Sequence, residues 1–135
     1  MRPGRNDVVW SRGRAIRRAG YQAYMQSPQW FARRRWWFEE WVSRTQGVRR
    51  LQDSAAPVCL VCGRLWTLRE GDLHHVTYDR LGAEAFEDLV PLCRTHHEAL
   101  HDLYDASPLW RRTGRVQATY GIIGVLKRRT QDTTP

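Results

Sequence analysis

The histidines and cysteines of this chain are confined to one stretch, and this feature constrains the fold more than any other. All five histidines and all three cysteines lie between Cys59 and His101. They form four groups: Cys59-x-x-Cys62, His74-His75, Cys93-x-x-His96 and His97-x-x-x-His101. These side chains bind metal ions or transfer protons near neutral pH. The stretch therefore contains enough ligands for two metal sites and still leaves one imidazole for chemistry.

Length and composition suit a single folded domain. The chain has 135 residues, of which 41% are hydrophobic and 27% charged, as in globular rather than disordered proteins. The first residues contain no apolar signal segment, and the longest apolar run, 120–126, is too short to cross a bilayer. We therefore expect a soluble, cytoplasmic protein with no membrane partner. Its thiols would stay reduced there, which favours metal ligation over disulfides.

The net charge of +8 is distributed unevenly along the chain. Residues 1–57 carry twelve arginines against four acidic residues, and residues 106–135 carry six basic residues against one. Between them, residues 58–105 have a balance of −5. Basic flanks on both sides of a candidate metal centre favour a polyanionic partner, because phosphates can be bound on either side.

A helix is expected over residues 27–45. Ser27 and Pro28 are typical of an N-cap and a first helical position. Apolar residues recur at helical spacing and should pack on the metal module: Trp30, Phe31, Trp37, Phe38, Trp41 and Val42. The run Arg33-Arg34-Arg35 falls mainly outside this stripe and is a candidate nucleic-acid contact. Trp36 could stack on a base, although partial burial is the favoured interpretation.

The pattern beyond the helix predicts a knuckle, a strand, a loop, a second strand and a helix. Their expected ranges are 58–63, 73–78, 79–87, 88–92 and 94–104. A further helix over 115–129 would place Val116, Tyr120, Ile123 and Leu126 on one face. The chain then divides into four parts: a basic arm or helix (1–26), a Trp/Arg-rich helix and linker (27–57), a core (58–105) and a basic extension (106–135). The arm either orders on nucleic acid or is a solvated tail.

Two pairs with x-x spacing, thirty residues apart, are typical of a zinc site. Cys59, Cys62, Cys93 and His96 would give a closed tetrahedron, which is the form of a structural zinc site. Such an ion would stabilise a core as small as this one. The alternative is that Cys59 and Cys62 are simply buried thiols.

The stretch LHHVTYDRLGAEAFEDLVPLCRTHHEALH resembles the HNH endonucleases, also called ββα-metal or His-Me finger nucleases. It is most similar to the variety with a C-x-x-C knuckle before the motif, and the resemblance covers about residues 58–102. The resemblance implies an α+β fold with a small ββα-metal core, a structural Zn²⁺ and a catalytic divalent ion (Mg²⁺, Mn²⁺ or Ni²⁺). It also implies cleavage of DNA phosphodiester bonds.

The resemblance assigns roles to individual residues. His75 matches the general base, and His74, His97 and His101 match the ligands of the catalytic ion. Asp88 matches the central asparagine that holds the loop, and a carboxylate can do so only by accepting hydrogen bonds. His96 stands where a fourth cysteine is usual. Because adjacent helical residues point about 100° apart, His96 and His97 can serve different metals.

Other interpretations stay open. Arg80, in the expected loop, could reach a phosphate or serve only as a surface residue. A single module would nick one strand, so a double-strand break would need a homodimer or a larger complex. The chain could instead be a non-catalytic zinc module that binds nucleic acid, or a ribonuclease using the same site. His75 could also be an ordinary buried strand histidine.

Overall fold

The computed structural model describes residues 20–46 and 56–132. Its elements, in order, are α2 (Pro28–Gln46), β1 (Asp72–His75), the 3-10 helix η1 (Phe86–Asp88), β2 (Leu89–Leu92), α3 (Arg94–Ala106), α4 (Pro108–Thr113) and α5 (Arg115–Asp132). A helical segment over residues 20–25 precedes α2. The prediction of an α+β fold is confirmed. Most of the predicted basic arm and of the linker lies outside the described residues.

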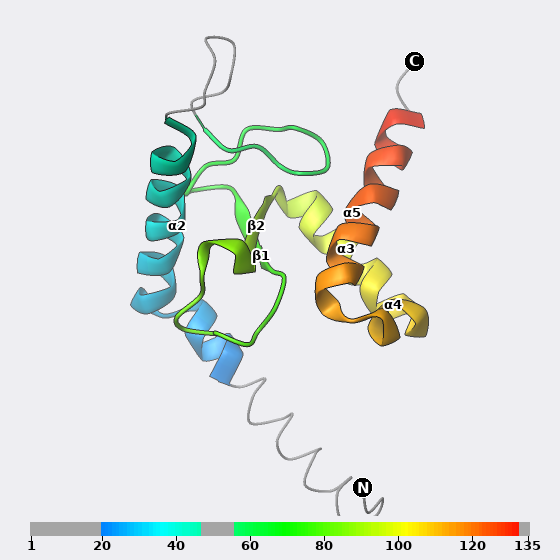
Figure 1. Ribbon diagram of the computed structural model, residues 1–135, viewed down its shortest axis with the longest axis horizontal. Helices are drawn as coiled ribbons and strands as arrows, with labels where there is room; N and C mark the ends of the chain where they lie inside the picture. Colours follow the sequence, from blue (N-terminus) through cyan, green and yellow to red (C-terminus); the bar gives the residue numbers. More distant parts are fainter. Residues whose placement is uncertain (1–19, 47–55, 133–135) are drawn as a thin grey trace, which may run out of the picture.

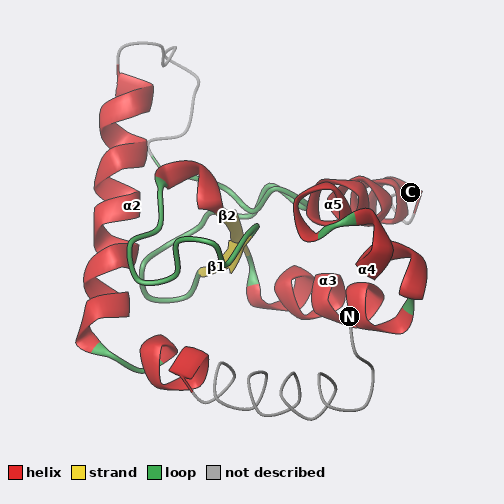
Figure 2. Ribbon diagram, turned by 60° about the horizontal axis from the view of Figure 1, so that its bottom comes forward, coloured by secondary structure: helices red, strands yellow, loops and turns green. Residues whose placement is uncertain are grey.

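The two strands form a small antiparallel sheet at the centre of the molecule. Asp72 pairs with Leu92 and His75 pairs with Leu89 at the two ends of the ladder. Helix α2 lies on one side of the sheet, and α3, α4 and α5 lie together on the other side (Figure 1). The same division is visible when the molecule is turned (Figure 2). The first strand was predicted to be longer, but the chain leaves the ladder after His75 and turns at Tyr78.

Helix α2 forms where it was expected and covers one face of the sheet. Ser27 caps it, because its hydroxyl accepts the backbone N–H of Trp30 at 3.2 Å. Trp30 and Trp37 are buried against Leu73 of β1 and other apolar residues. Most of the predicted apolar stripe faces this cluster, but Phe31 does not, since it is 57% exposed. Trp36 is partly buried there, as favoured over base stacking.

Helices α3 and α5 pack on the opposite face of the sheet. Val90 and Leu92 of β2 contribute to a second cluster with Leu100 of α3 and Ile122 of α5. Leu89, one residue before Val90, belongs instead to the cluster beneath α2. The strands therefore bury alternate residues on two faces, with the period of two that a pleated strand imposes.

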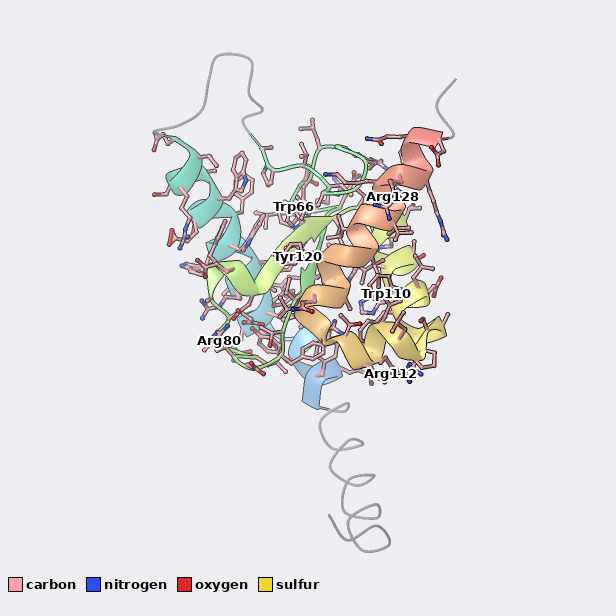
Figure 3. The ribbon with its side chains drawn as sticks, turned by 45° about the vertical axis from the view of Figure 1, so that its right-hand side comes forward. Trp66, Arg80, Trp110, Arg112, Tyr120 and Arg128 are labelled. Atoms are coloured by element: carbon pink, nitrogen blue, oxygen red, sulfur yellow. The ribbon has the colours of Figure 1, made fainter. Side chains whose placement is uncertain are left out.

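The C-terminal helix forms, and two of the four residues on its predicted face, Ile123 and Leu126, are buried, but the other two are not. Val116 and Tyr120 are 49% and 50% exposed. The buried residues of α5 are Ala118, Thr119, Ile122, Ile123 and Leu126. Trp110 of α4 explains this rotation, because its ring packs so closely on Gly121 that an added Cβ would lie 2.7 Å away. Close packing of α4 turns the helix away from the face that hydrophobicity alone suggested (Figure 3).

The knuckle 58–63 is attached directly to the sheet. The N–H of Leu60 donates to the carbonyl of Pro91 in β2 at 3.1 Å, and Gly63 donates to the carbonyl of Cys59 at 2.9 Å. Gly63 has a φ of 76°, which a residue with a side chain adopts only with strain. Glycine after the second cysteine thus lets the chain reverse within the knuckle. No helix in the described parts of the chain has the length and apolarity needed to cross a membrane.

Gly71 should tolerate no side chain. A Cβ at this position would lie 2.3 Å from the ring of Trp66, which is buried and packs edge-on against Trp37. Gly71→Ala is therefore expected to lower the unfolding free energy by about 1–3 kcal/mol, as overpacking does. Urea denaturation would measure this change.

Gly124→Ala is the matched control. Its nearest neighbour would be the Arg128 guanidinium at an ordinary 3.6 Å, and alanine is favoured over glycine within a helix by up to about 1 kcal/mol. We expect this variant to be neutral or more stable. Equal destabilisation by the two substitutions would contradict the close packing at Trp66.

Candidate functional site

Four predicted zinc ligands come together at the end of β2. Cys59 and Cys62 lie in the knuckle, while Cys93 and His96 lie at the start of α3. Their ligand atoms all lie within 4.8 Å of one another, which is close enough to hold a metal ion such as zinc. All three cysteines are free thiols. The cluster joins the knuckle, the sheet and α3 at one point.

The spacing of these atoms matches a tetrahedron. The sulfurs of Cys62 and Cys93 are 4.0 Å apart, and the His96 Nδ1 lies 3.3 Å from the sulfur of Cys93 and 3.9 Å from that of Cys59. Tetrahedral zinc at its usual bond lengths places two sulfurs about 3.8 Å apart and sulfur and nitrogen about 3.6 Å apart. A disulfide would need sulfurs about 2 Å apart. The geometry therefore fits a metal site and not a disulfide.

Hydrogen bonds prepare Cys59 for the thiolate form that metals require. Burial raises the pKa of its thiol, but backbone N–H groups, including that of Val61, outweigh burial and lower the pKa overall. A thiol held closer to ionisation gives up its proton to a metal more readily.

The second cluster consists of three imidazoles. His74 of β1 and His97 and His101 of α3 each offer a ligand nitrogen, and these nitrogens lie within 4.8 Å of one another. The Nε2 atoms of His97 and His101 are 3.1 Å apart. Two nitrogens bound to one ion at about 2.1 Å lie roughly 3.0–3.4 Å apart in octahedral or tetrahedral geometry. His96 and His97 thus face different clusters, as their adjacency on a helix predicted.

Neighbouring polar groups fix the orientation of these imidazoles. Asp72 Oδ2 lies 3.0 Å from His97 Nδ1, so a proton on Nδ1 leaves the Nε2 lone pair free. The hydroxyl of Thr119 lies 3.0 Å from His74 Nε2. The remaining His74 nitrogen, Nδ1, is buried and has no hydrogen-bond partner. An orphaned nitrogen beside two other imidazoles is the arrangement expected of a metal ligand.

The protonation of the cluster also suits ligation. Burial and, after it, nearby positive charge from Arg115 lower the pKa of His74 to about 2. Burial and the neighbouring His97 lower the pKa of His101 to about 4. Both imidazoles are therefore neutral near pH 7, with lone pairs available to an ion.

His75 follows His74 in the chain but lies on the other face of the sheet. Its Nε2 is 2.7 Å from Glu84 Oε2, and both side chains are almost fully buried. Its ring stacks on Trp30 at 5.0 Å, and the rings of Tyr21 and Tyr78 lie at 5.9 and 5.5 Å. Its Nδ1 is buried without a partner. The imidazole is thus held at one nitrogen and unpaired at the other.

Glu84 is an anion within a network of donors. Tyr24 donates its hydroxyl to Oε1 at 2.8 Å, and Arg33 lies 3.7 Å from the same oxygen. Burial raises the pKa of Glu84, but the bonds from His75 and Tyr24 outweigh it and keep the pKa below its ordinary value. The carboxylate therefore stays charged next to the imidazole.

Asp88 holds the loop that follows β1. It accepts the backbone N–H of Ala85 at 2.8 Å and a two-pronged ion pair from Arg80. These are acceptor bonds, as predicted for a carboxylate at this position. They lower the pKa of Asp88, the bond from Arg80 contributing most. Arg80 is about half exposed, but its guanidinium is already paired (Figure 3).

The three consecutive arginines of α2 differ in how far their side chains are bonded within the protein. Arg34 donates to the carbonyls of Leu68 and Gly71 at 2.8 and 2.7 Å, so it holds the turn before β1. Arg33 pairs with Glu84, whereas Arg35 is exposed. Of the three arginines of α2 that were predicted to contact nucleic acid, Arg35 is the one whose surroundings leave it most available.

A cavity of about 450 Å³ opens beside the three-imidazole cluster. His97, His101 and Asp72 form part of its wall, and Tyr21, Met25 and Trp30 form another part. The exposed side of the cluster thus faces a space large enough for a substrate group.

The fold and the site together define the class of protein. This is a small α+β protein with two side-chain clusters, one of Cys₃His type and one of three imidazoles, either of which could hold a metal ion. Comparisons with known protein families, with curated proteins and with solved structures found no match to this chain. Its function is therefore argued from the site.

Sequence reasoning missed three residues that contact the site histidines: Glu84 and Thr119 bond imidazole nitrogens, and Arg115 bonds the backbone carbonyl of His75. Glu84 belongs to the quoted motif, but no pattern indicated that its side chain would turn inward to His75. Thr119 and Arg115 lie on α5, outside the motif, and the misplaced face of that helix hid Thr119. A helical pattern centred on Ala118 and Ile122 would have identified it.

Removing metal from the Cys₃His cluster should unfold the core. Zinc binding to such sites is worth about 10–16 kcal/mol in small zinc-finger peptides, which is comparable to the whole stability of a domain, about 5–15 kcal/mol. We expect Cys59→Ser to lose bound zinc and its cooperative thermal transition. Metal analysis and thermal denaturation would measure both effects.

His101→Ala is the control for this experiment, because it alters only the three-imidazole cluster. It should retain one tightly bound zinc per chain and a cooperative transition. A chelator that leaves the melting temperature of the unaltered protein unchanged would rule out a structural metal.

Proposed function

We propose that this protein is a metal-dependent endonuclease of the HNH type that hydrolyses phosphodiester bonds of DNA. One observation carries the proposal. Two adjacent strand residues, His74 and His75, each present a buried and unpaired Nδ1, one within a cluster of imidazoles and the other beside a carboxylate. An unpaired buried nitrogen is costly, so two in succession are better explained by chemistry than by packing.

His75 has the proton arrangement of a general base. Its Nε2–H donates to Glu84, which fixes the tautomer with the lone pair on Nδ1. As the oxygen of water attacks phosphorus, Nδ1 takes the proton of that water, the bond to the leaving 3′ oxygen breaks, and this oxygen takes a proton from solvent. The carboxylate of Glu84 stabilises the positive charge that develops on the ring. The resemblance implies products with 5′-phosphate and 3′-hydroxyl ends.

His74, His97 and His101 are the residues that would hold the catalytic ion. An ion bound there would supply positive charge to a non-bridging oxygen and to the leaving oxygen. An all-imidazole set favours Mn²⁺, Ni²⁺ or another transition ion over Mg²⁺. Zn²⁺ in the Cys₃His cluster would have a structural role only.

The base is covered in this structure. Tyr21, Trp30 and Tyr78 surround the ring of His75, whose Nδ1 has no exposure to solvent. Trp30 is fixed in the core, while Tyr78 is 41% exposed on the loop after β1. Approach of a phosphate to Nδ1 therefore requires Tyr21 or Tyr78 to shift.

A non-catalytic zinc module that binds nucleic acid is the second candidate. It requires only the Cys₃His cluster and basic surfaces, and it leaves the buried pair His75–Glu84 without a purpose. A ribonuclease would use the same groups, so a matched RNA substrate belongs in every assay. One site per chain implies nicking, and double-strand cleavage would require a homodimer.

His75→Ala should abolish nicking of supercoiled plasmid. Loss of a general base typically lowers the rate roughly 10²–10⁴-fold. The assay would compare relaxed and supercoiled plasmid over time with Mg²⁺, Mn²⁺ or Ni²⁺ added. Tyr120→Ala, on the exposed face of α5, is the control and should retain the wild-type rate. Unchanged nicking by a folded His75→Ala protein would exclude His75 as the base.

Glu84→Gln should lower kcat more than it alters KM. The amide keeps the size of the side chain but provides no charge to stabilise the imidazolium, so a loss of at least about tenfold in kcat is expected. Steady-state nicking kinetics would separate the two constants. If kcat is unchanged while the melting temperature falls, Glu84 supports the fold and not the reaction.

A further inference from the structure

Arg115 connects α5 to the edge of β1 that does not pair with β2. It is the first residue of α5, and its Nε donates to the backbone carbonyl of His75 at 2.8 Å. It thereby reaches the site from the basic extension, outside the stretch that resembles a nuclease motif.

The direction of the His75 carbonyl identifies this edge. The N–H of Val76 donates to the carbonyl of Asp88, so Val76 turns its backbone towards the partner strand. In an antiparallel ladder the backbone direction alternates, so the carbonyl of His75 points away from β2. The guanidinium of Arg115 therefore lies along the outer edge of β1, between the face with the ring of His74 and the face with the ring of His75.

A group at this edge lies between the two sets of imidazoles. The ring of His74 faces α3, and the ring of His75 faces α2. Arg115 packs on Tyr104 of α3, the helix that the ring of His74 faces, and on Tyr78, whose ring lies 5.5 Å from that of His75. Together with the bond to His75, this places the cation close to both.

Arg115 differs from its neighbours because it has no anionic partner. Arg33, Arg80 and Arg94 each pair with a carboxylate near the site. Among the described residues, no carboxylate forms an ion pair with Arg115, which instead packs on the rings of Tyr78 and Tyr104 at 4.3 and 5.6 Å. A cation is also disfavoured at a helix N-terminus. The positive charge of Arg115 is therefore not neutralised by an acidic side chain of the described residues.

We propose that Arg115 is a further catalytic residue that binds a non-bridging oxygen of the DNA phosphodiester at the outer edge of β1. Its Nε keeps the bond to the His75 carbonyl, and its Nη groups, which carry four further N–H donors, contact the phosphate. Two buried, unpaired nitrogens, His74 Nδ1 and His75 Nδ1, belong to adjacent residues of this strand. This inference rests on the proposed endonuclease function.

The alternative is that Arg115 has only a structural role, in which it holds α5 against β1 without contacting the substrate. Arg115→Met keeps the aliphatic stem and removes the donors, and Arg115→Lys keeps the charge without the fork. Arg112→Met is the matched control, because Arg112 is exposed on α4 and its loss changes the net charge equally (Figure 3). Melting temperature and zinc content would be measured for every variant.

Nicking kinetics provide the first test. We expect Arg115→Met to lower kcat roughly 10²–10³-fold, as loss of one preorganised donor to a reacting phosphate does, while Arg112→Met stays within about threefold of wild type. Arg115→Lys should recover part of the loss. Equal kcat values for the two methionine variants would overturn the proposal.

A phosphorothioate substrate provides the decisive test, since an Arg115 with only a structural role does not contact the phosphate. Sulfur in place of one non-bridging oxygen at the cleaved bond should slow the wild-type enzyme for one diastereomer. The same substitution should have little further effect on Arg115→Met, because the contact is already lost. If sulfur slows Arg115→Met as much as it slows the wild-type enzyme, for both diastereomers, the proposal is overturned.

A separate measurement tests the phosphate contact of Arg115 if the protein proves not to be an endonuclease. If the wild-type protein cleaves neither DNA nor RNA with any of the ions, binding of a DNA duplex would decide the role of Arg115. Weaker binding by Arg115→Met than by Arg112→Met would then support a phosphate contact, and equal weakening would overturn it.

Discussion

The alternation of side chains along β1 is the constraint on which the site depends. A strand turns consecutive residues to opposite faces, so His74 and His75 cannot share one environment. The ring of His74 therefore meets α3, while the ring of His75 meets α2 and the loop that carries Glu84. The two clusters of the core, one beneath each set of helices, are built around the same alternation.

This arrangement makes the centre of the protein unusually polar. His74, His75, Glu84, Asp88 and Thr119 are buried together with the apolar core. Buried polar groups are tolerated when they are hydrogen-bonded, and most atoms of this set are. His75 bonds Glu84, and His74 bonds Thr119. The unpaired imidazole nitrogens stand out because the rest of the network is satisfied.

Local patterns in the sequence predicted the elements and the metal ligands. The cap at Ser27 and the helical periodicity placed α2, and the two x-x pairs placed the Cys₃His cluster. The 100° rotation between adjacent helical residues separated His96 from His97 correctly. The helix and the knuckle were predictable because each depends on residues that are close in the chain. The two x-x pairs, thirty residues apart, could be joined because a tetrahedral zinc site requires four ligands.

Tertiary packing determined what the sequence did not reveal. The exposed face of α5 follows from the fit of Trp110 on Gly121, a contact between two helices. The partner of His75 depends on how the loop before η1 folds back, and hydropathy gives no sign that a charged Glu84 is buried. Arg34 was predicted to face nucleic acid, but it donates to two carbonyls of a turn more than thirty residues away.

The first turn of α3 carries a ligand of each cluster on consecutive residues, His96 and His97. An ion in the Cys₃His cluster would fix the position of this turn and so reduce the entropy that His97 loses on binding a second ion. The two clusters would then be thermodynamically linked, and by reciprocity each ion would raise the affinity for the other by the same factor. The Cys₃His cluster and the three-imidazole cluster would bind their ions cooperatively, because adjacent residues of one helical turn belong to each.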